Sequence, residues 1–297
     1  MRNNIHKYFG RNKIANTFIP KFYIMKFNLL FITIVLSVFS CNSQKIPKVQ
    51  NDLQKNNLFG NISEITEVSN SDAFKINELD KKTVDKYDEE GFLKESAIIR
   101  QDSSISIKSL YTYDADRNLI EENWISEDYS DNRIERQFDN KGRMTNYLFY
   151  DNNEVTMSMK FEYDDENNTL KQYEYFSEGK LSSIMEYKFD ENDFLKESSW
   201  YDENGKFQNK TVFINDDSGK PVEVKFYKSD DKLKSTTIYK YDEFNNEILT
   251  SRNSNDANFV YHIETQYKYD KYGNWTEQVR MKGGIPMFIY KREIKYY

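Results

Sequence analysis

The chain has 297 residues, of which 38% are hydrophobic and 31% are charged. It contains a single cysteine, so a framework of disulfides within the chain is excluded. The first 40 residues contain six basic residues and no acidic ones, which leaves 42 − 6 = 36 basic against 49 acidic residues, a net charge of −13. Such an acidic chain repels phosphate backbones, and this argues against nucleic acid as a partner.

The N-terminus predicts a secretory signal. A basic residue in Met25-Lys26 precedes the short apolar run 29–36, and this run is followed by Ser40-Cys41. A basic segment followed by a short apolar core is typical of signal peptides, and the core is too short for a membrane span. We therefore expect residues 1–40 to be a signal peptide, within which residues 1–24 are an upstream extension if translation starts at Met25.

Cys41 is the predicted lipidation site, because Ser40-Cys41 resembles the end of a bacterial lipobox. Lipid at Cys41 would anchor the chain without spanning the membrane. We expect residues 41–57 to comprise this cysteine and a polar tether, and residues 58–297 to form one repeat domain. The segment Asn42-Ser43-Gln44-Lys45 lacks the acidic residues that resemble surface-export signals, which favours the periplasmic face of the outer membrane over the cell surface.

An aromatic residue followed by aspartate returns along the domain at a fixed interval. From Asp88 to Asp270 there are seven intervals, so (270 − 88)/7 gives a period of 26 residues. A weaker series of turns falls midway, which places one turn every 12 to 14 residues and leaves about 8 for a strand. The strong series is Tyr87-Asp88, Tyr113-Asp114, Phe138-Asp139, Tyr163-Asp164, Phe189-Asp190, Ile214-Asn215, Tyr241-Asp242 and Tyr269-Asp270. This pattern predicts an array of β-hairpins, each burying its apolar face on its neighbours.

The turn residues support hairpins. In the segment from Asp139 to Gly142, aspartate opens the turn by accepting backbone N–H bonds, and glycine closes it in the left-handed conformation. Where glycine is missing, we expect Asn167, Asn245 and Asp193 to take the left-handed position.

Alternation between the turns predicts an antiparallel sheet. Val155, Met157, Met159, Phe161 and Tyr163 fall on one face of a single strand, and polar residues fall on the other. The predicted fold is all-β, an antiparallel meander of about sixteen strands. Because open twisted sheets rarely exceed about 10 strands, we expect a long curled or spiral sheet, and pattern leaves open whether it closes fully.

The repeated motif resembles the YD repeats of the RHS family. It is clearest in the segment from Tyr87 to Leu93, which reads Tyr-Asp-Glu-Glu-Gly-Phe-Leu. The segments 269–276 and 292–297 are similar to those of small lipoproteins of Bacteroidetes-type bacteria. The resemblance implies β-hairpins wound into a shell, and carbohydrate binding is often attributed to the family. This chain lacks the Asp-Pro-x-Gly-Leu signature of the large toxin-encasing members, so a self-cleaving toxin shell is not expected.

Residues for catalysis are few. The histidines are His6, which precedes the predicted cleavage point, and His262, which falls in a predicted strand. Without a second partner, histidine-based triads are not expected. Asp114, Asp116 and Asn118 offer oxygen atoms at alternate positions, but Leu119 occupies the position where a calcium loop needs glycine, so a simple turn is predicted. We expect no enzyme activity, no cofactor and no metal.

Two functions remain open. The first is a non-catalytic, envelope-anchored binding module in which aromatic residues stack on a carbohydrate or another cell-envelope ligand; the candidate binding residues are Trp124, Trp200 and Trp275. The second is a structural or protein-interaction scaffold in the envelope, where a free edge strand could pair with a partner sheet. In both cases we expect a monomer that contacts the membrane through its lipid anchor alone.

Overall fold

The computed structural model describes residues 50–70, 81–126, 132–255 and 259–297. All of them belong to one compact unit within Phe39–Tyr297. The predicted signal peptide and the predicted lipidation site Cys41 lie outside the described residues. In the described part of the chain, no helix is long and apolar enough to cross a membrane.

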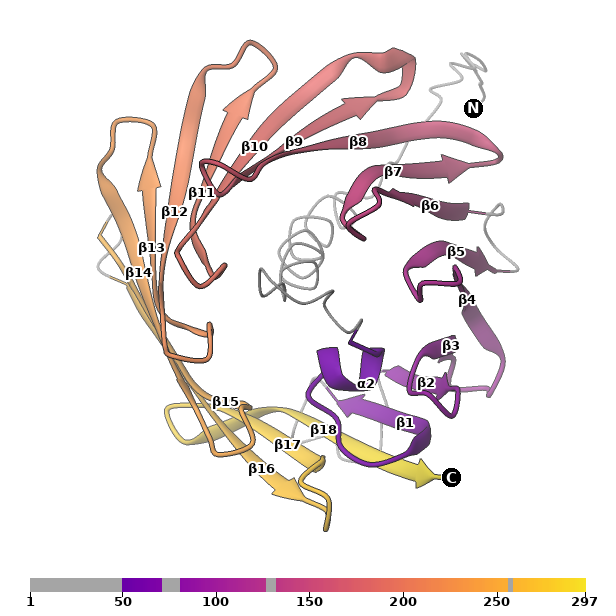
Figure 1. The fold of residues 1–297 in the computed structure, drawn as a ribbon. Helices are drawn as coiled ribbons and strands as arrows, with labels where there is room; N and C mark the ends of the chain where they lie inside the picture. Colours follow the sequence, from indigo (N-terminus) through magenta and orange to yellow (C-terminus); the bar gives the residue numbers. More distant parts are fainter. Residues whose placement is uncertain (1–49, 71–80, 127–131, 256–258) are drawn as a thin grey trace, which may run out of the picture. The chain divides into compact units, whose positions relative to one another are not determined.

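The described residues form a short helix, a 3₁₀ turn and eighteen strands (Figure 1). The helix is α2 (Asp52–Lys55) and the turn is η1 (Ser177–Gly179). The strands are β1 (Ile62–Asn70), β2 (Lys81–Tyr87), β3 (Leu93–Ile99), β4 (Ile105–Tyr113), β5 (Leu119–Ile125), β6 (Asn132–Phe138), β7 (Met144–Asp151), β8 (Glu154–Asp164), β9 (Thr169–Phe176), β10 (Leu181–Phe189), β11 (Leu195–Asp202), β12 (Phe207–Asn215), β13 (Pro221–Lys228), β14 (Leu233–Tyr241), β15 (Glu247–Ser254), β16 (Phe259–Tyr269), β17 (Trp275–Lys282) and β18 (Ile285–Tyr296).

The sheet closes on itself. Each strand pairs antiparallel with the next, and β1 also pairs with β18, with Ile65 opposite Ile294 and Val68 opposite Lys291. In Figure 1 the indigo β1 accordingly lies beside the yellow β18. The predicted antiparallel hairpins are confirmed, but the predicted curled or spiral open sheet is wrong, because the last strand satisfies the free edge of the first. No strand in the described ranges keeps a free edge for a partner sheet.

The two faces of the sheet differ in composition. Residues directly opposite in neighbouring strands share a face, and following the register around the ring assigns Met157, Met159, Phe161 and Tyr163 to one face. We call this the tyrosine face. It also carries Tyr87, Tyr111, Tyr113, Tyr147, Tyr187, Tyr239, Tyr241, Tyr267 and Tyr269.

The opposite face, the charged face, carries cross-strand ion pairs. Examples are Lys86 with Glu95, Lys188 with Glu197 and Lys268 with Glu277. The predicted alternation in β8 is confirmed from Met157 to Phe161, whose apolar side chains are buried. Val155 is instead 41% exposed, and here a register shift between Phe149 and Tyr150 sets two residues of β8 against one of β7, which interrupts the alternation.

Turns of two kinds mark the two ends of the ring. The strong turns follow even-numbered strands, and in each the aspartate accepts backbone N–H groups; Asp139 accepts from Lys141 and Arg143, both at 2.9 Å. Asn245 and Asp193 have positive φ as predicted, but in the β8–β9 turn the left-handed residue is Asn168, not Asn167. We call the end with these turns the strong-turn end and the opposite end the weak-turn end.

Candidate functional site

At the strong-turn end, the residue before the turn aspartate joins one hairpin to the previous hairpin. The hydroxyls of Tyr113, Tyr163 and Tyr241 donate to the main-chain oxygens of the residues that begin β3, β7 and β13, at 2.8, 3.0 and 2.9 Å. Asn215 does the same through its amide, donating to Leu195 at 2.8 Å. The tyrosine of the motif is therefore a structural clamp between repeats.

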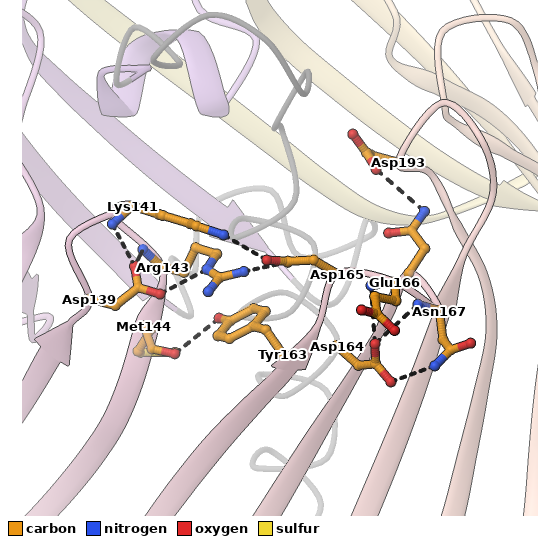
Figure 2. A network of polar contacts seen from close by, with 11 residues as sticks. Asp139, Lys141, Arg143, Met144, Tyr163, Asp164, Asp165, Glu166, Asn167 and Asp193 are labelled. Carbon is orange, nitrogen blue, oxygen red and sulfur yellow. Dashed lines mark hydrogen bonds and ion pairs between the residues drawn. The ribbon is translucent and has the colours of Figure 1, made fainter.

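A polar network crosses three successive strong turns (Figure 2). Asp165 accepts from Lys141 and from Arg143, both at 2.6 Å, and Arg143 also donates to Asp139 at 2.8 Å. The Arg143 guanidinium lies 4.3 Å from the centre of the Tyr163 ring. The network continues to the third turn through Asn168, which donates to the main-chain oxygen of Asp190 at 2.6 Å.

The charges of this network are mutually satisfied. Burial alone would raise the pKa of Asp139, but the hydrogen bonds from Arg143 and Lys141 outweigh it and hold that pKa below its usual value. The hydrogen bond from Lys141 is the main cause of the lowered pKa of Asp165. Asp139 and Asp165 each already have a cationic partner, so the network is better suited to joining turns than to binding a ligand.

The three candidate tryptophans do not share a site. They lie on β5, β11 and β17, which are six strands apart in each case (11 − 5 and 17 − 11). Six strand spacings correspond to a distance of about 29 Å along the sheet. Trp124 donates to Glu122 at 2.6 Å and its ring packs 5.9 Å from that of Phe149. Trp275 is covered by Arg292, whose guanidinium lies 3.4 Å from the ring centre. These two indoles are held by the protein's own side chains.

Trp200 differs from the other two because its side chain is exposed, at 38%. It lies on the tyrosine face near the weak-turn end, opposite Met185 on β10 and Asn209 on β12. In the described ranges, the Asn209 side chain makes no hydrogen bond. An exposed indole beside an available amide offers a stacking surface and hydrogen-bonding atoms.

Other exposed apolar side chains gather at the same end of the ring. Each lies among the first or last three residues of its strand, next to a weak turn. They are Ile105, Ile125, Val155, Phe176, Val260, Tyr261, Ile285 and Met287. We call them, together with Trp200, the apolar rim. Exposed apolar residues offer a contact surface where they lie side by side.

A second polar cluster lies on the tyrosine face around Arg136. This guanidinium pairs with Glu122 at 3.2 Å, lies 5.5 Å from the centre of the Tyr147 ring, and is 10% exposed. Burial raises the pKa of Tyr147 to about 12. The buried Nη1 of Arg136 has no hydrogen-bond partner. Because that atom is fully covered, it is not accessible to a ligand.

The remaining candidates for chemistry lie in a strand and in a turn. His262 lies on the charged face with its Nε2 3.3 Å from Glu264, and both side chains are about half exposed. Asp114 accepts from the backbone and side-chain nitrogens of Asn118, at 2.8 and 3.0 Å, as the predicted simple turn requires. No group of three or more His, Cys, Asp or Glu side chains suited to a metal ion occurs in the described part of the chain.

Comparison with known proteins gives structural similarities alone. No protein-family model matches the chain, and no curated protein matches it. A porin-like protein from Bacteroides uniformis ATCC 8492 is 9% identical, with 80% of this chain and 99% of that chain covered and a TM-score of 0.40. A porin-like protein from Bacteroides vulgatus ATCC 8482 is 12% identical, with 80% and 98% covered and a TM-score of 0.35.

A third similar structure is TcdB2-TccC3 without its hypervariable C-terminal region. It is 13% identical, with 68% of this chain and 14% of that chain covered and a TM-score of 0.25. TM-scores this low do not show membership of either group.

Sequence reasoning missed the clamp and the apolar rim. The sequence contains a signal for the clamp, because the donor and the acceptor residue are 19 or 20 residues apart in all four cases. No signal distinguishes Trp200 from Trp124 and Trp275, because exposure depends on which neighbours the ring supplies.

Proposed function

We propose that this protein is a non-catalytic binding module of the cell envelope, anchored by lipid at Cys41, with its binding surface at the apolar rim around Trp200. The exposed Trp200 ring beside Asn209 is the observation that supports it. Carbohydrate is the favoured ligand class, since a sugar ring stacks its apolar face on an indole and its hydroxyls bond to side-chain amides. The periplasmic face of the outer membrane remains the favoured location.

The position of Phe176 suggests an extended ligand. Phe176 is 55% exposed and lies on the tyrosine face of β9, two strands from Trp200. In the strand register, Gln172 of β9 pairs with Met185, and Met185 pairs with Trp200. Phe176 lies four residues after Gln172 on the same strand. Strand spacing and rise place the two rings roughly 16 Å apart. A ligand that touches both must be longer than a single sugar ring.

The test is binding of residues 42–297 to a glycan array, with each hit repeated by calorimetry. Trp200→Ala should weaken binding at least tenfold and leave unfolding unchanged, and Phe176→Ala should weaken only the longer oligosaccharides. Ile238→Ala is the matched control, because Ile238 is 45% exposed but lies on the charged face of β14. Binding that survives Trp200→Ala, or an array without hits from folded protein, would refute a carbohydrate site here.

A second function is favoured by the aliphatic part of the apolar rim. Ile105, Ile125, Ile285 and Met287 are exposed side chains that sugars do not require. They suit a protein scaffold in the envelope that docks a partner on the rim. Crosslinking from Ile125 and Ile285 in living cells would capture a specific protein under this alternative. Docking through a free edge strand is not part of it, because β1 and β18 pair with each other.

A further inference from the structure

The ring junction is the place where the last strand meets the first. Eight residue pairs join β1 to β18, from Ile62 with Tyr296 to Asn70 with Ile289. Because loop-closure entropy grows with sequence separation, a strand pair formed across the whole length of the chain costs more to close than a hairpin does. Contacts that hold this junction together therefore offset a cost that the hairpin pairs do not have to the same extent.

Residues 51–61, which we call the strap, supply contacts on the first side of that junction. Asn51 caps α2 and donates to the main-chain oxygen of Glu90 at 2.5 Å. Asp52 accepts from the Leu93 backbone at 2.9 Å, and it shares the single proton of the Tyr113 hydroxyl, 2.6 Å away, with the Leu93 main-chain oxygen. These partners belong to the β2–β3 turn, to β3 and to β4.

The strap also binds the second side of the junction. Asn274, in the β16–β17 turn and 1% exposed, accepts from the Phe59 backbone and donates to the Phe59 oxygen, both at 2.7 Å. Asn57 donates to the main-chain oxygen of Phe244 in the β14–β15 turn. The backbone N–H of Tyr297 donates to the Asn61 oxygen at 2.9 Å.

The apolar residues of the strap complete a core at the junction. Leu53 and Leu58 are buried with Ile62 and Ile65 of β1 and Tyr87 of β2. Leu93, Ile294 and Tyr296 pack against this cluster, so it contains side chains from β1, β2, β3 and β18. Burial of Leu53 and Leu58 removes their apolar surface from water and so stabilises this core.

We propose that the strap is a latch that holds the ring closed at the β18–β1 junction. It contacts both sides of the junction, and its release leaves β1 and β18 joined by main-chain hydrogen bonds without their shared core. The strap lies directly before β1 in the sequence. A force applied to the chain N-terminal to the strap therefore loads the contacts of the strap before it loads the strands of the ring. This inference does not depend on the proposed binding function.

The test is hydrogen exchange of residues 42–297 with Asp52→Ala. We expect amides of β1 and β18 to exchange at least about tenfold faster, while those of β8, β9 and β10 on the far side of the ring do not change. Asn215→Ala is the control, because it removes a side-chain bond between neighbouring hairpins, to the Leu195 oxygen, away from the junction. Uniform acceleration in all strands, or no acceleration in β1 and β18, would overturn the latch.

A disulfide across the junction provides the second measurement. Val68 and Lys291 lie opposite each other on β1 and β18, and residues 42–297 contain no cysteine, so Val68→Cys with Lys291→Cys can form a single disulfide. In the Asp52→Ala background, this disulfide should return β1 and β18 to their original exchange rates, and reduction should reverse the effect. If the oxidised protein exchanges as fast as the reduced one, the strap does not act through the junction.

Discussion

The hydroxyl of Tyr163 donates a hydrogen bond to the main-chain oxygen of Met144, which begins the return strand of the previous hairpin, at 3.0 Å. Met144 is buried, so its carbonyl group has little access to water. The bond gives this tyrosine of the 26-residue motif a physical role, which Tyr113 and Tyr241 share: it ties a hairpin to the hairpin before it. A repeat array gains most of its stability from such contacts between neighbours.

Tyr163→Phe should lower the free energy of unfolding by about 1 kcal/mol, because it leaves the Met144 oxygen without this donor. Urea denaturation measures the change. Tyr175→Phe is the control, since Tyr175 lies on the other face of β9 and its hydroxyl makes no hydrogen bond within the described ranges. Equal losses in the two variants would show that the clamp contributes nothing.

Two turn glycines should respond differently to alanine. Both have positive φ, +85° at Gly219 and +74° at Gly205, so each replacement costs about 1–2 kcal/mol of backbone strain. A Cβ atom at Gly219 would lie 2.4 Å from Cδ1 of Phe194, whereas one at Gly205 meets nothing within 4 Å. Gly219→Ala should therefore destabilise by a further ~1–3 kcal/mol, measured by thermal or urea unfolding. A Phe194→Ala background should remove this excess.

Two aspartates of the Figure 2 network should differ in their contribution to stability. Asp139→Ala removes the acceptor of two backbone N–H groups and should cost about 1–3 kcal/mol. Asp165 is 60% exposed and contributes only surface ion pairs, so Asp165→Ala should cost below about 1 kcal/mol. Unfolding in 0.1 and 1 M NaCl distinguishes the two variants. Salt should screen the ion pairs and abolish the stability loss of Asp165→Ala, while the loss of Asp139→Ala should remain.

Stability should depend on pH through Asp85. Burial raises the pKa of its carboxyl above the ordinary value of 3.8, with Glu67 adding to the rise and the Ser96 hydrogen bond opposing it. The folded state therefore binds this proton more tightly than the unfolded state. The contribution of Asp85 is most favourable below pH 3.8 and is lost as pH rises through the folded pKa.

Asp85→Asn should thus be more stable than the original protein at pH 7, with the difference vanishing near pH 3. Asparagine keeps an oxygen that can accept from Ser96, so the local hydrogen bond survives the change. Denaturation curves at several pH values measure the difference between the two proteins. A difference that stays constant from pH 3 to 7 would contradict a titrating Asp85.

Sequence patterns predicted the local structure well where it depends on neighbours along the chain. The turn at Asp139 and the alternation from Met157 to Phe161 follow from hydrogen bonding within five residues and from the two-residue period of a strand. The same reasoning failed at Val155 and at Asn167, because a bulge or a shifted turn residue changes which side chain is covered. These shifts depend on the register of the neighbouring strand.

The candidate site was predicted only in part. Trp200 was one of three tryptophans named from the sequence, and nothing in composition separates it from Trp124 or Trp275. The difference comes from Glu122 and Phe149, which hold Trp124, and from Arg292, which covers Trp275. Those partners are brought close by strand pairing, which a single sequence does not display.

The sequence by itself determined the repeat, the hairpins and the antiparallel sheet, because each of these depends on interactions between residues at most one repeat apart. Only the tertiary structure decided that the ring closes, since that depends on Ile65 meeting Ile294 from the far end of the chain. The strap and the division into a polar strong-turn end and an apolar rim are decided in the same way. Contacts over such separations depend on the accumulated curvature of eighteen strands, which no local pattern encodes.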